Sequence, residues 1–444
     1  MVGRGSLTAM DARELITDTA DPVRFRVDRR IYTDADIFAT ELKQIFERTW
    51  VYLCHESQIA EHGDYYATYM GAQPVFAIRQ TDGAIGAFIN ACAHRGAVLT
   101  PRRRGRARTI VCRFHGWCYD TNGACVRIKD EATGWPDGID KSAHGLTPVG
   151  RVASYRGFVF GCLDPGVGGL EDDLGAARPF IDLLSDQSPE GLEVVPGQQT
   201  YIIRGNWKLQ AENGVDGYHV STVHRVFAQA MGLREQLGDN SGNRPTEAGR
   251  IKGNVETGCY DLGRGHNIIW AGRANPAVAP LFEAEARLID EFGQAKTDWM
   301  LRRGRNLYLF PNVQLMDQSS TQIRVFRPLS PNRTEVRVYC IAPKGESRGA
   351  RVARLRKFED FFMVTGMATP DDLAALEDCQ IGAKGTASRW SDMERGLSAM
   401  TQGPDDLARG IGAQVASSAG RWDHETLYHG YFRRWAALMD DQGG

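Results

Sequence analysis

The sequence has almost no net charge, no long apolar run and few cysteines. Its 53 Lys and Arg residues against 55 Asp and Glu residues give a net charge of −2. This balance argues against nucleic acid as the main partner, because phosphate binding needs a surplus of positive charge. Without an uninterrupted apolar stretch of about 18 residues, we expect no membrane span and no membrane partner. Nine cysteines in 444 residues are too sparse for a disulfide scaffold, so we expect a cytoplasmic protein with reduced thiols.

What the sequence does have is enough apolar material for a sizeable core. Hydrophobic residues make up 42% and charged residues 24% of the chain, which is typical of globular proteins. The length predicts two or more domains, or one large domain with an insert. Residues 34–50 carry apolar side chains at helical spacing. Between residues 52 and 163, short β-rich runs alternate with turn signals such as Asn122-Gly123, which predicts a small antiparallel β domain.

The second half of the chain mixes strands and helices. Strands are predicted at residues 321–329 and 334–341, and the alternation in the second predicts that only one of its faces is buried. Helices are predicted at residues 172–184, 207–224 and 351–363. In the last helix a stripe of apolar residues is expected to be buried: Val352, Leu355, Phe358 and Phe362. Because strands and helices do not alternate as βαβ units, we expect an α+β fold.

Two pairs of cysteine and histidine form the first group of candidate metal ligands. Cys92-x-His94 is followed, after seventeen residues, by Cys112-x-x-His115. Each pair comes after a β-rich run and can therefore lie on a loop at a strand end. Such a set suits tetrahedral zinc, or a Rieske [2Fe–2S] cluster in which two cysteines bind one iron and two histidines the other. The one-residue gap in the first pair is tighter than is usual for zinc fingers, which favours the cluster.

Two histidines with nearby carboxylates form the second group. His219 and His224 are five residues apart, which corresponds to about 140° around an ideal α-helix. A helix end or a π-type turn between them is therefore needed to aim both at one ion. Asp216 lies three residues before His219 and shares its face of a helix.

A third ligand has to come from far along the chain, and Asp372 is the candidate. A second interpretation is that Thr369, Pro370 and Asp372 form the start of a helix that resembles a capping box. A redox cluster upstream, however, needs a destination for its electrons. Two histidines and one carboxylate form the facial triad of non-haem Fe(II) oxygenases, so we expect His219, His224 and Asp372 to bind iron.

With both groups in this order, the sequence resembles the large (α) subunits of Rieske non-haem iron ring-hydroxylating dioxygenases over nearly its whole length. Within that family it is most similar to the benzoate, toluate and anthranilate 1,2-dioxygenase group. Besides Cys-x-His-Arg-Gly and Cys-x-x-His-Gly-Trp, the resemblance is carried by residues 186–193, 205–224, 306–312, 315–318, 341–346 and 366–373.

The resemblance implies a role for each candidate residue. It implies that the [2Fe–2S] cluster is held by Cys92, His94, Cys112 and His115. It implies that the mononuclear iron is held by His219, His224 and Asp372, with Asn213 close to it. Asp216 would link His115 of one subunit to His219 of the next, which implies a head-to-tail trimer.

The resemblance also implies three parts of the chain. Residues 1–50 would be an N-terminal helical part of the catalytic domain, residues 51–165 a Rieske domain, and residues 166–444 the catalytic mononuclear-iron domain, with an antiparallel sheet and flanking helices. A reductase with flavin and iron–sulfur groups, or a ferredoxin, would deliver electrons from NADH. The chain would form a trimer, either by itself or with a small β subunit in an assembly with three copies of each subunit.

The implied reaction uses O₂ to cis-dihydroxylate an aromatic carboxylate such as benzoate or anthranilate. Two alternatives remain open: a Rieske monooxygenase (hydroxylase or demethylase) on an aromatic acid, and a non-catalytic Rieske electron-transfer protein. Arg225, Arg302 and Arg303 depart from the pattern of the group. They leave the substrate open, because an arginine could bind a carboxylate or face solvent.

Overall fold

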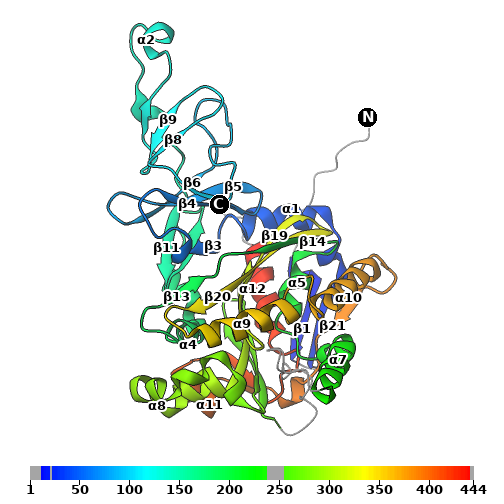
Figure 1. Ribbon diagram of the computed structural model, residues 1–444. Helices are drawn as coiled ribbons and strands as arrows, with labels where there is room; N and C mark the ends of the chain where they lie inside the picture. The colour runs from blue at the N-terminus through cyan, green and yellow to red at the C-terminus, as the bar shows by residue number, and fades with distance from the viewer. Residues whose placement is uncertain (1–11, 21–22, 238–254, 441–444) are drawn as a thin grey trace.

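The computed structural model describes residues 12–20, 23–237 and 255–440. A small β domain, built from strands β3 to β12, projects from a larger domain that contains both the first and the last elements of the chain (Figure 1). The expected α+β class is confirmed, with antiparallel sheets in both domains and helices around the larger one. None of the described helices has the length and apolar character that a membrane crossing requires.

Three small antiparallel sheets make up the β domain, with strand orders β6-β5-β4-β7, β10-β9-β8 and β11-β12-β3. The strands are β3 (Val51–His55), β4 (Asp64–Met70), β5 (Gln73–Arg79), β6 (Ile85–Ile89), β7 (Arg104–Arg106), β8 (Thr109–Val111), β9 (Cys118–Asp120), β10 (Cys125–Arg127), β11 (Arg151–Tyr155) and β12 (Phe158–Cys162), and a short helix α2 (Glu131–Gly134) follows β10. The predicted turn at Asn122-Gly123 joins β9 to β10. The tip of the domain has its own small core, which includes Phe76, Ile110 and Tyr119.

A ten-stranded sheet forms the centre of the larger domain. Its order is β13-β20-β19-β18-β17-β16-β15-β23-β22, and β14 also pairs with β20. The strands are β13 (Leu192–Val194), β14 (Gln199–Ile203), β15 (Thr257–Gly263), β16 (His266–Gly272), β17 (Arg303–Leu309), β18 (Val313–Asp317), β19 (Thr321–Ser330), β20 (Arg333–Pro343), β22 (Thr401–Gln402) and β23 (Ser417–Ala419). The two strands predicted from the sequence are thus confirmed as β19 and β20.

The expectation that β20 buries only one face is wrong. Val338 is buried, and so are Arg337 and Tyr339 on the opposite face. The β domain covers that face: Nη2 of Arg337 donates to Oγ1 of Thr68 (3.1 Å), and the hydroxyl groups of Tyr339 and Tyr66 are in contact. The alternation of polar and apolar residues along β20 predicts that these polar side chains face solvent, but they are part of the contact between the two domains.

Helices surround the sheet (Figure 1). They are α3 (Leu170–Leu174), α4 (Arg178–Ser185), α5 (Trp207–Asn213), α6 (Val220–Val223), α7 (Arg225–Gln236), α8 (Glu285–Arg302), α9 (Arg348–Phe361), α10 (Thr369–Gly382), α11 (Asp406–Gly410) and α12 (Tyr428–Asp440). The helix predicted at 172–184 is interrupted where Gly175 adopts a φ of 45°. The apolar stripe expected on α9 is wrong at Val352, which is 47% exposed, although Phe358 and Phe362 are buried.

The N-terminal segment is part of the larger domain. Strands β1 (Ile16–Ala20) and β2 (Val23–Asp28) form a sheet with β21 (Trp390–Asp392). Glu41, on helix α1 (Ala35–Gln44), is fully buried and pairs with the equally buried Lys208 of α5. Its carboxylate also accepts hydrogen bonds from Nε1 of Trp207 and of Trp435, both 2.8 Å long. This buried contact fixes α5, which leads into the site described next.

Candidate metal centres

The two Cys–His loops at the tip of the β domain have the same backbone hydrogen bonds. The amide of Cys92 donates to the carbonyl five residues further on (2.9 Å), and its own carbonyl accepts from the amide of Gly96 (2.8 Å). The amide of Cys112 also donates to the carbonyl five residues on (2.8 Å), and its carbonyl accepts from Gly116 (2.9 Å). Both glycines have positive φ, 71° and 72°, which glycine adopts without strain. Each loop thus presents one thiol and one imidazole from the same framework.

The four side chains converge with the thiols inside and the imidazoles outside. Cys92 and Cys112 are buried, whereas His94 is exposed and His115 is half-buried. The ring centroids of the two histidines are 4.7 Å apart. Trp117 stacks on His94, with ring centroids 4.9 Å apart and planes 5° apart, and so limits the orientation of that ring.

The electrostatics of this group fit a metal cluster. Burial raises the pKa of Cys92, so a thiolate at this position needs a nearby cation. Desolvation lowers the pKa of His115, and the neighbouring His94 adds to the effect, which favours the neutral imidazole that binds metals. Nδ1 of His115 is buried and has no hydrogen-bond partner within the described part of the chain.

His219, His224 and Asp372 meet at one point in the larger domain. Nε2 of His219 lies 3.3 Å from Nε2 of His224, and Oδ1 of Asp372 lies 3.3 Å from each of these nitrogens. The corners of such a triangle are about 1.9 Å from its centre. An ion just above the plane would therefore reach all three atoms at about 2.1 Å, a usual length for imidazole and carboxylate bonds to a divalent metal. The opposite side of the ion would stay free for other ligands.

Two short helices, and not one long helix, aim the histidines. Helix α5 ends at Asn213, and His219 and His224 flank the single turn of α6. Each histidine lies at one end of this single turn, so no long straight helix carries both, as the five-residue spacing required. Gly217 lies in the loop between the helices, where a Cβ atom would come within 2.5 Å of the carbonyl oxygen of Trp422, so a side chain at this position would displace the loop.

Asp372 contacts the histidines and does not cap helix α10. The N-cap residue of α10 is Ala368, and Oγ1 of Thr369 donates to the carbonyl of Phe362 (3.0 Å), so the capping-box interpretation is wrong. Nδ2 of Asn213 donates to Oδ1 of Asp372 (3.2 Å). Burial raises the pKa of Asp372, but its hydrogen bonds to the two imidazoles outweigh burial and hold the pKa well below the usual range. The carboxylate is therefore ionised at neutral pH.

Asp216 lies on the outer side of His219. Its Oδ2 is 3.2 Å from Nδ1 of His219, and its side chain is 30% exposed. Its Oδ1 accepts a hydrogen bond from the amide of Tyr218 (2.6 Å). Burial lowers the pKa of His219, but contacts with Asp216 and Asp372 outweigh burial and raise it to about 10. The negative charge that favours a proton here also favours a metal dication.

A cavity opens beside the three ligand side chains. Its walls include Met316 and Arg324 from the sheet and Phe361, Phe362 and Trp422 from the surrounding elements. About half of the residues that line this cavity are apolar and the others are polar or charged, a mixture that suits a small organic molecule with a polar group.

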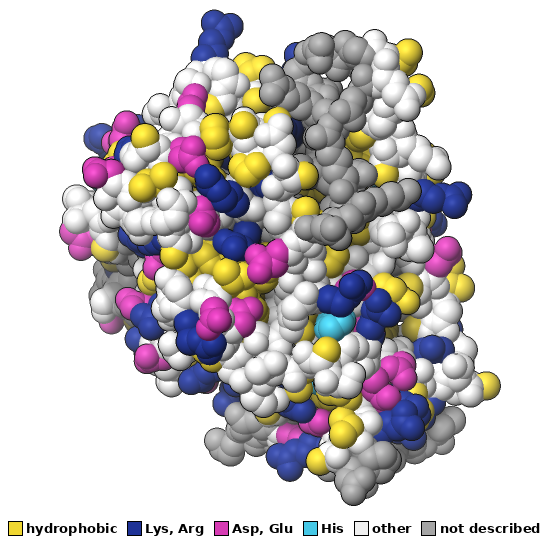
Figure 2. Space-filling model, turned by 90° about the horizontal axis from the view of Figure 1, so that it is seen from below, with side chains coloured by type: hydrophobic (Ala, Val, Ile, Leu, Met, Phe, Trp, Pro, Cys, Tyr) yellow, Lys and Arg dark blue, Asp and Glu magenta, His cyan; other side chains and the backbone are white. Residues whose placement is uncertain are grey.

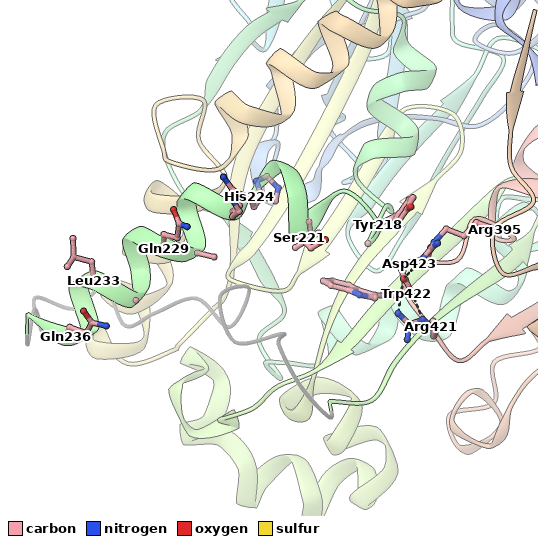
Figure 3. Close-up of a pocket in the computed structure, with 15 residues that line it drawn as sticks. Tyr218, Ser221, His224, Gln229, Leu233, Gln236, Arg395, Arg421, Trp422 and Asp423 are labelled. Carbon is pink, nitrogen blue, oxygen red and sulfur yellow. Dashed lines mark hydrogen bonds and ion pairs between the residues drawn. The ribbon is translucent and has the colours of Figure 1, made fainter. Parts of the chain in front are cut away.

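An outer cavity adjoins this inner one, and His224 and Trp422 line both. Figure 3 shows His224 on one side of it, and Trp422, Arg421 and Asp423 on the other. Asp423 binds Nη2 of Arg395 (2.7 Å) and Nε of Arg421 (2.9 Å), so these two arginines are already paired. On the face seen in Figure 2, basic and acidic side chains are interspersed, and neither sign dominates.

The three unusual arginines lie outside the inner cavity. Arg225 is exposed and lines the outer cavity. Arg302 pairs with Glu285 (2.7 Å) and Arg303 with Glu256 (3.3 Å). Four residues that the sequence motifs did not mark as site residues line the inner cavity instead: Arg324, Met316, Phe361 and Phe362. The alternation of β19 was the available signal for Arg324, but it does not show what covers that face of the sheet.

The two centres lie at opposite ends of the molecule. The Cys–His loops belong to the tip that carries β9 and α2, whereas His219 and His224 lie next to α7 (Figure 1). A β domain with two Cys–His loops, joined to a domain with two histidines and one carboxylate around an open position, defines the class of Rieske non-haem iron oxygenases.

Comparison with known families assigns the chain within this class. Residues 49–155 match the Rieske [2Fe–2S] domain, and residues 192–439 match the family described as ring hydroxylating alpha subunit (catalytic domain). The second match covers more than half of the chain, and the chain belongs to this family.

Individual relatives agree with the family. The chain is 46% identical to the toluate 1,2-dioxygenase α subunit of Pseudomonas putida, over 94% of this chain and 91% of that protein. It is 42% identical to the 2-halobenzoate 1,2-dioxygenase large subunit of Burkholderia cepacia, over 96% and 93%. A solved naphthalene 1,2-dioxygenase variant bound to phenanthrene superposes with a TM-score of 0.82 at 26% identity, over 97% of this chain and 95% of that one.

These matches settle the class of protein and its cofactors. The β domain is a Rieske [2Fe–2S] domain, the larger domain binds a mononuclear iron, and the chain is an oxidoreductase of the ring-hydroxylating dioxygenase family. The zinc interpretation and the non-catalytic electron carrier are therefore wrong for this chain. The names of the relatives, "subunit alpha" and "large subunit", describe parts of larger assemblies.

Proposed function

We propose that this chain is the large subunit of an oxygenase that adds both atoms of O₂ to neighbouring ring carbons of an aromatic carboxylate and yields a cis-diol. The observation that carries the proposal is the triangle of His219, His224 and Asp372 beside a cavity with apolar and polar walls, in a chain 46% identical to a toluate 1,2-dioxygenase α subunit. NADH supplies the electrons through a reductase or a ferredoxin, which suits aromatic catabolism in the cytoplasm.

The residues at the tip of the Rieske domain fit the cluster. Cys92 and Cys112 would hold one iron, and His94 and His115 the other. The buried thiol of Cys92, which needs a cation, and the unpartnered Nδ1 of His115 support this assignment. When bound, the cluster transfers single electrons, and the mononuclear iron activates O₂.

At the second centre each residue has a separate task. His219, His224 and Asp372 would hold the iron, and Asn213 fixes the carboxylate of Asp372 through its hydrogen bond (3.2 Å). Because Asp372 stays ionised at neutral pH, it presents a negative oxygen to the metal without first losing a proton. Ile269, Met316 and Phe361 place apolar surface beside the space next to these ligands.

The proposed assembly is a head-to-tail trimer of this chain, completed by small β subunits. The two centres of one chain lie at opposite ends of the molecule (Figure 1), so a neighbouring chain has to bring them together. Phe114 and Tyr218 expose 57% and 52% of their surface, one at the tip and the other beside Asp216, which suits contact between copies. In this arrangement Asp216 would join His219 to His115 of the partner subunit.

Product analysis under labelled oxygen tests the proposal. The purified protein, with its reductase and NADH, is incubated with benzoate or anthranilate under ¹⁸O₂. We expect a ring diol in which both oxygen atoms carry the label. A product with one labelled oxygen would assign the chain as a monooxygenase, and unlabelled product would overturn the proposal.

A further inference from the structure

We infer that Arg324 binds the carboxylate group of the substrate, an inference that rests on the proposed function. Arg324 lines the inner cavity together with the three ligand side chains of the mononuclear centre. It lies on β19, opposite Gln314 of β18. Nε2 of Gln314 donates to the carbonyl of Ala211 in α5 (3.0 Å), so Gln314 and Arg324 share the face of the sheet that α5 covers.

Arg324 differs from the other buried arginines. Four arginines are buried in the described part of the chain, and three of them have a carboxylate partner: Arg305 with Asp317, Arg337 with Glu335 and Arg354 with Glu346. Arg324 is only 3% exposed. Within the described residues, no carboxylate, carbonyl or aromatic ring binds its side chain, and its Nε is buried without a partner.

A buried guanidinium without a counter-charge is costly, because nothing offsets the loss of hydration. An anion in the inner cavity would remove this cost. The planar fork of a guanidinium matches the two oxygens of a carboxylate, so an organic carboxylate is the partner that the geometry of Arg324 favours.

The rest of the cavity suits the ring of such a ligand. Ile269, Met316 and Phe361 give it apolar walls, and an aromatic ring gains free energy when it leaves water to pack against them. A carboxylate held at Arg324 restricts which edge of the ring faces the metal ligands. Arg324 therefore contributes to the choice of ring position as well as to affinity. Arg225 does not take this role, because it is exposed and lines only the outer cavity.

The test compares charged and neutral ligands in Arg324 variants. Arg324→Gln and Arg324→Lys are purified as complete oxygenase, and the Kd values of benzoate and of its neutral isostere benzamide are measured by calorimetry without O₂. We expect Arg324→Gln to weaken benzoate binding by about 10- to 100-fold, the range for lost hydrogen bonds to a charged group, and to leave benzamide binding unchanged. Arg324→Lys keeps the charge but not the fork, so its loss should be smaller.

Arg327→Gln is the matched control. Arg327 lies on the same strand, but its guanidinium packs over the ring of Tyr69 in the Rieske domain (3.1 Å). This variant removes the same charge from β19 and should leave the Kd of benzoate unchanged. Iron content and the visible spectrum of the cluster confirm that each variant is folded and loaded.

Steady-state kinetics provides a second readout. In Arg324→Gln the KM for benzoate should rise by a factor similar to that of Kd, with a smaller change in kcat, and the ratio of ring-oxidation products should shift. If the wild-type enzyme binds and oxidises benzoate and Arg324→Gln does so with the same Kd and KM, the inference about Arg324 is wrong while the proposed function stands. If the wild-type enzyme neither binds nor oxidises benzoate or anthranilate, both are overturned.

Discussion

The two metal centres of this chain are built in different ways. The first takes its four candidate ligands from residues 92–115, on two loops with the same hydrogen bonds, and the tip that carries them has its own core. The second joins ligands from residues 219–224 to Asp372, and its cavity is formed by the central sheet and several helices. The first is therefore a local structure, whereas the second depends on contacts between segments far apart in the sequence. Distant substitutions in the larger domain should disturb the second centre and leave the first intact.

Removal of Asp372 should show the largest difference between the two centres, because it should affect the second and leave the first intact. Asp372→Ala takes away one of the three candidate iron ligands, and we expect activity to fall by roughly three orders of magnitude, since metal-assisted catalysis contributes several kcal/mol. Iron should fall from about three to about two atoms per chain, while the spectrum of the [2Fe–2S] cluster stays unchanged. Iron analysis and reduced-state EPR check this. An unchanged rate of product formation would rule out Asp372 as a ligand.

A substitution far from both centres tests the dependence of the second on distant contacts. Glu41→Ala leaves Lys208 buried without its counter-charge, which should cost about 3–5 kcal/mol of stability in the larger domain. We expect a lower Tm and a loss of mononuclear iron, because α5 leads directly into the site.

Lys43→Ala is the control for Glu41→Ala. It removes an exposed pair with Glu47 on the same helical segment (3.1 Å), and such pairs contribute less than about 1 kcal/mol. Both variants should keep the visible spectrum of the cluster. Loss of the cluster in Glu41→Ala, together with the mononuclear iron, would contradict the independence of the two centres.

A half-buried carboxyl group, that of Glu212, makes a smaller, pH-dependent contribution to the stability of the larger domain. Burial raises the pKa of Glu212 from 4.5 to about 8, and its Oε1 accepts a hydrogen bond from the hydroxyl of Tyr32 (2.9 Å). Between these pH values the folded state holds a proton that the unfolded state has lost. The stabilisation is therefore complete below pH 4.5 and is lost as the pH rises towards 8.

Glu212→Gln should remove this dependence on pH, because glutamine keeps the hydrogen bond but does not titrate. Between pH 5 and 8, wild type should lose about 1–3 kcal/mol more stability than Glu212→Gln, measured as the shift in Tm of the larger domain. Glu359→Gln, at an exposed position on α9, should follow wild type. Equal slopes in wild type and Glu212→Gln would show that Glu212 is ionised in the folded protein.

The fold class and the first metal centre could be predicted from the sequence. For the centre, the spacing of Cys92, His94, Cys112 and His115 within two short loops already indicates that the four side chains meet. The spacing of His219 and His224 also showed that one straight helix cannot aim both side chains at the same ion. The role of Asp372 was ambiguous, since a carboxylate in the first turn of a helix is usually a cap. Three-dimensional contacts decided it: the two imidazoles and Asn213 surround its carboxylate.

Features that depend on packing between distant segments could not be predicted. Alternation along β20 indicated two faces but not the β domain that covers the face of Arg337 and Tyr339. Likewise, the position of Arg324 in β19 gives its face of the sheet but not the absence of a carboxylate partner. Arg225 and Arg302 were considered as partners for a substrate carboxylate because they depart from the pattern of the related proteins. The structure instead places Arg324 in the same cavity as the metal ligands.

The central claim is that electrons pass from the cluster of one chain to the mononuclear iron of the next chain. Complementation of two inactive variants tests this claim most directly. Cys112→Ser should remove the cluster and Asp372→Ala the mononuclear iron, and each trimer alone should be inactive. Co-expressed in equal amounts, they should assemble at random and recover about one quarter of wild-type activity, because half of the iron sites are intact and half of their neighbours carry a cluster. Mixed trimers of the correct size that remain inactive would contradict transfer between chains.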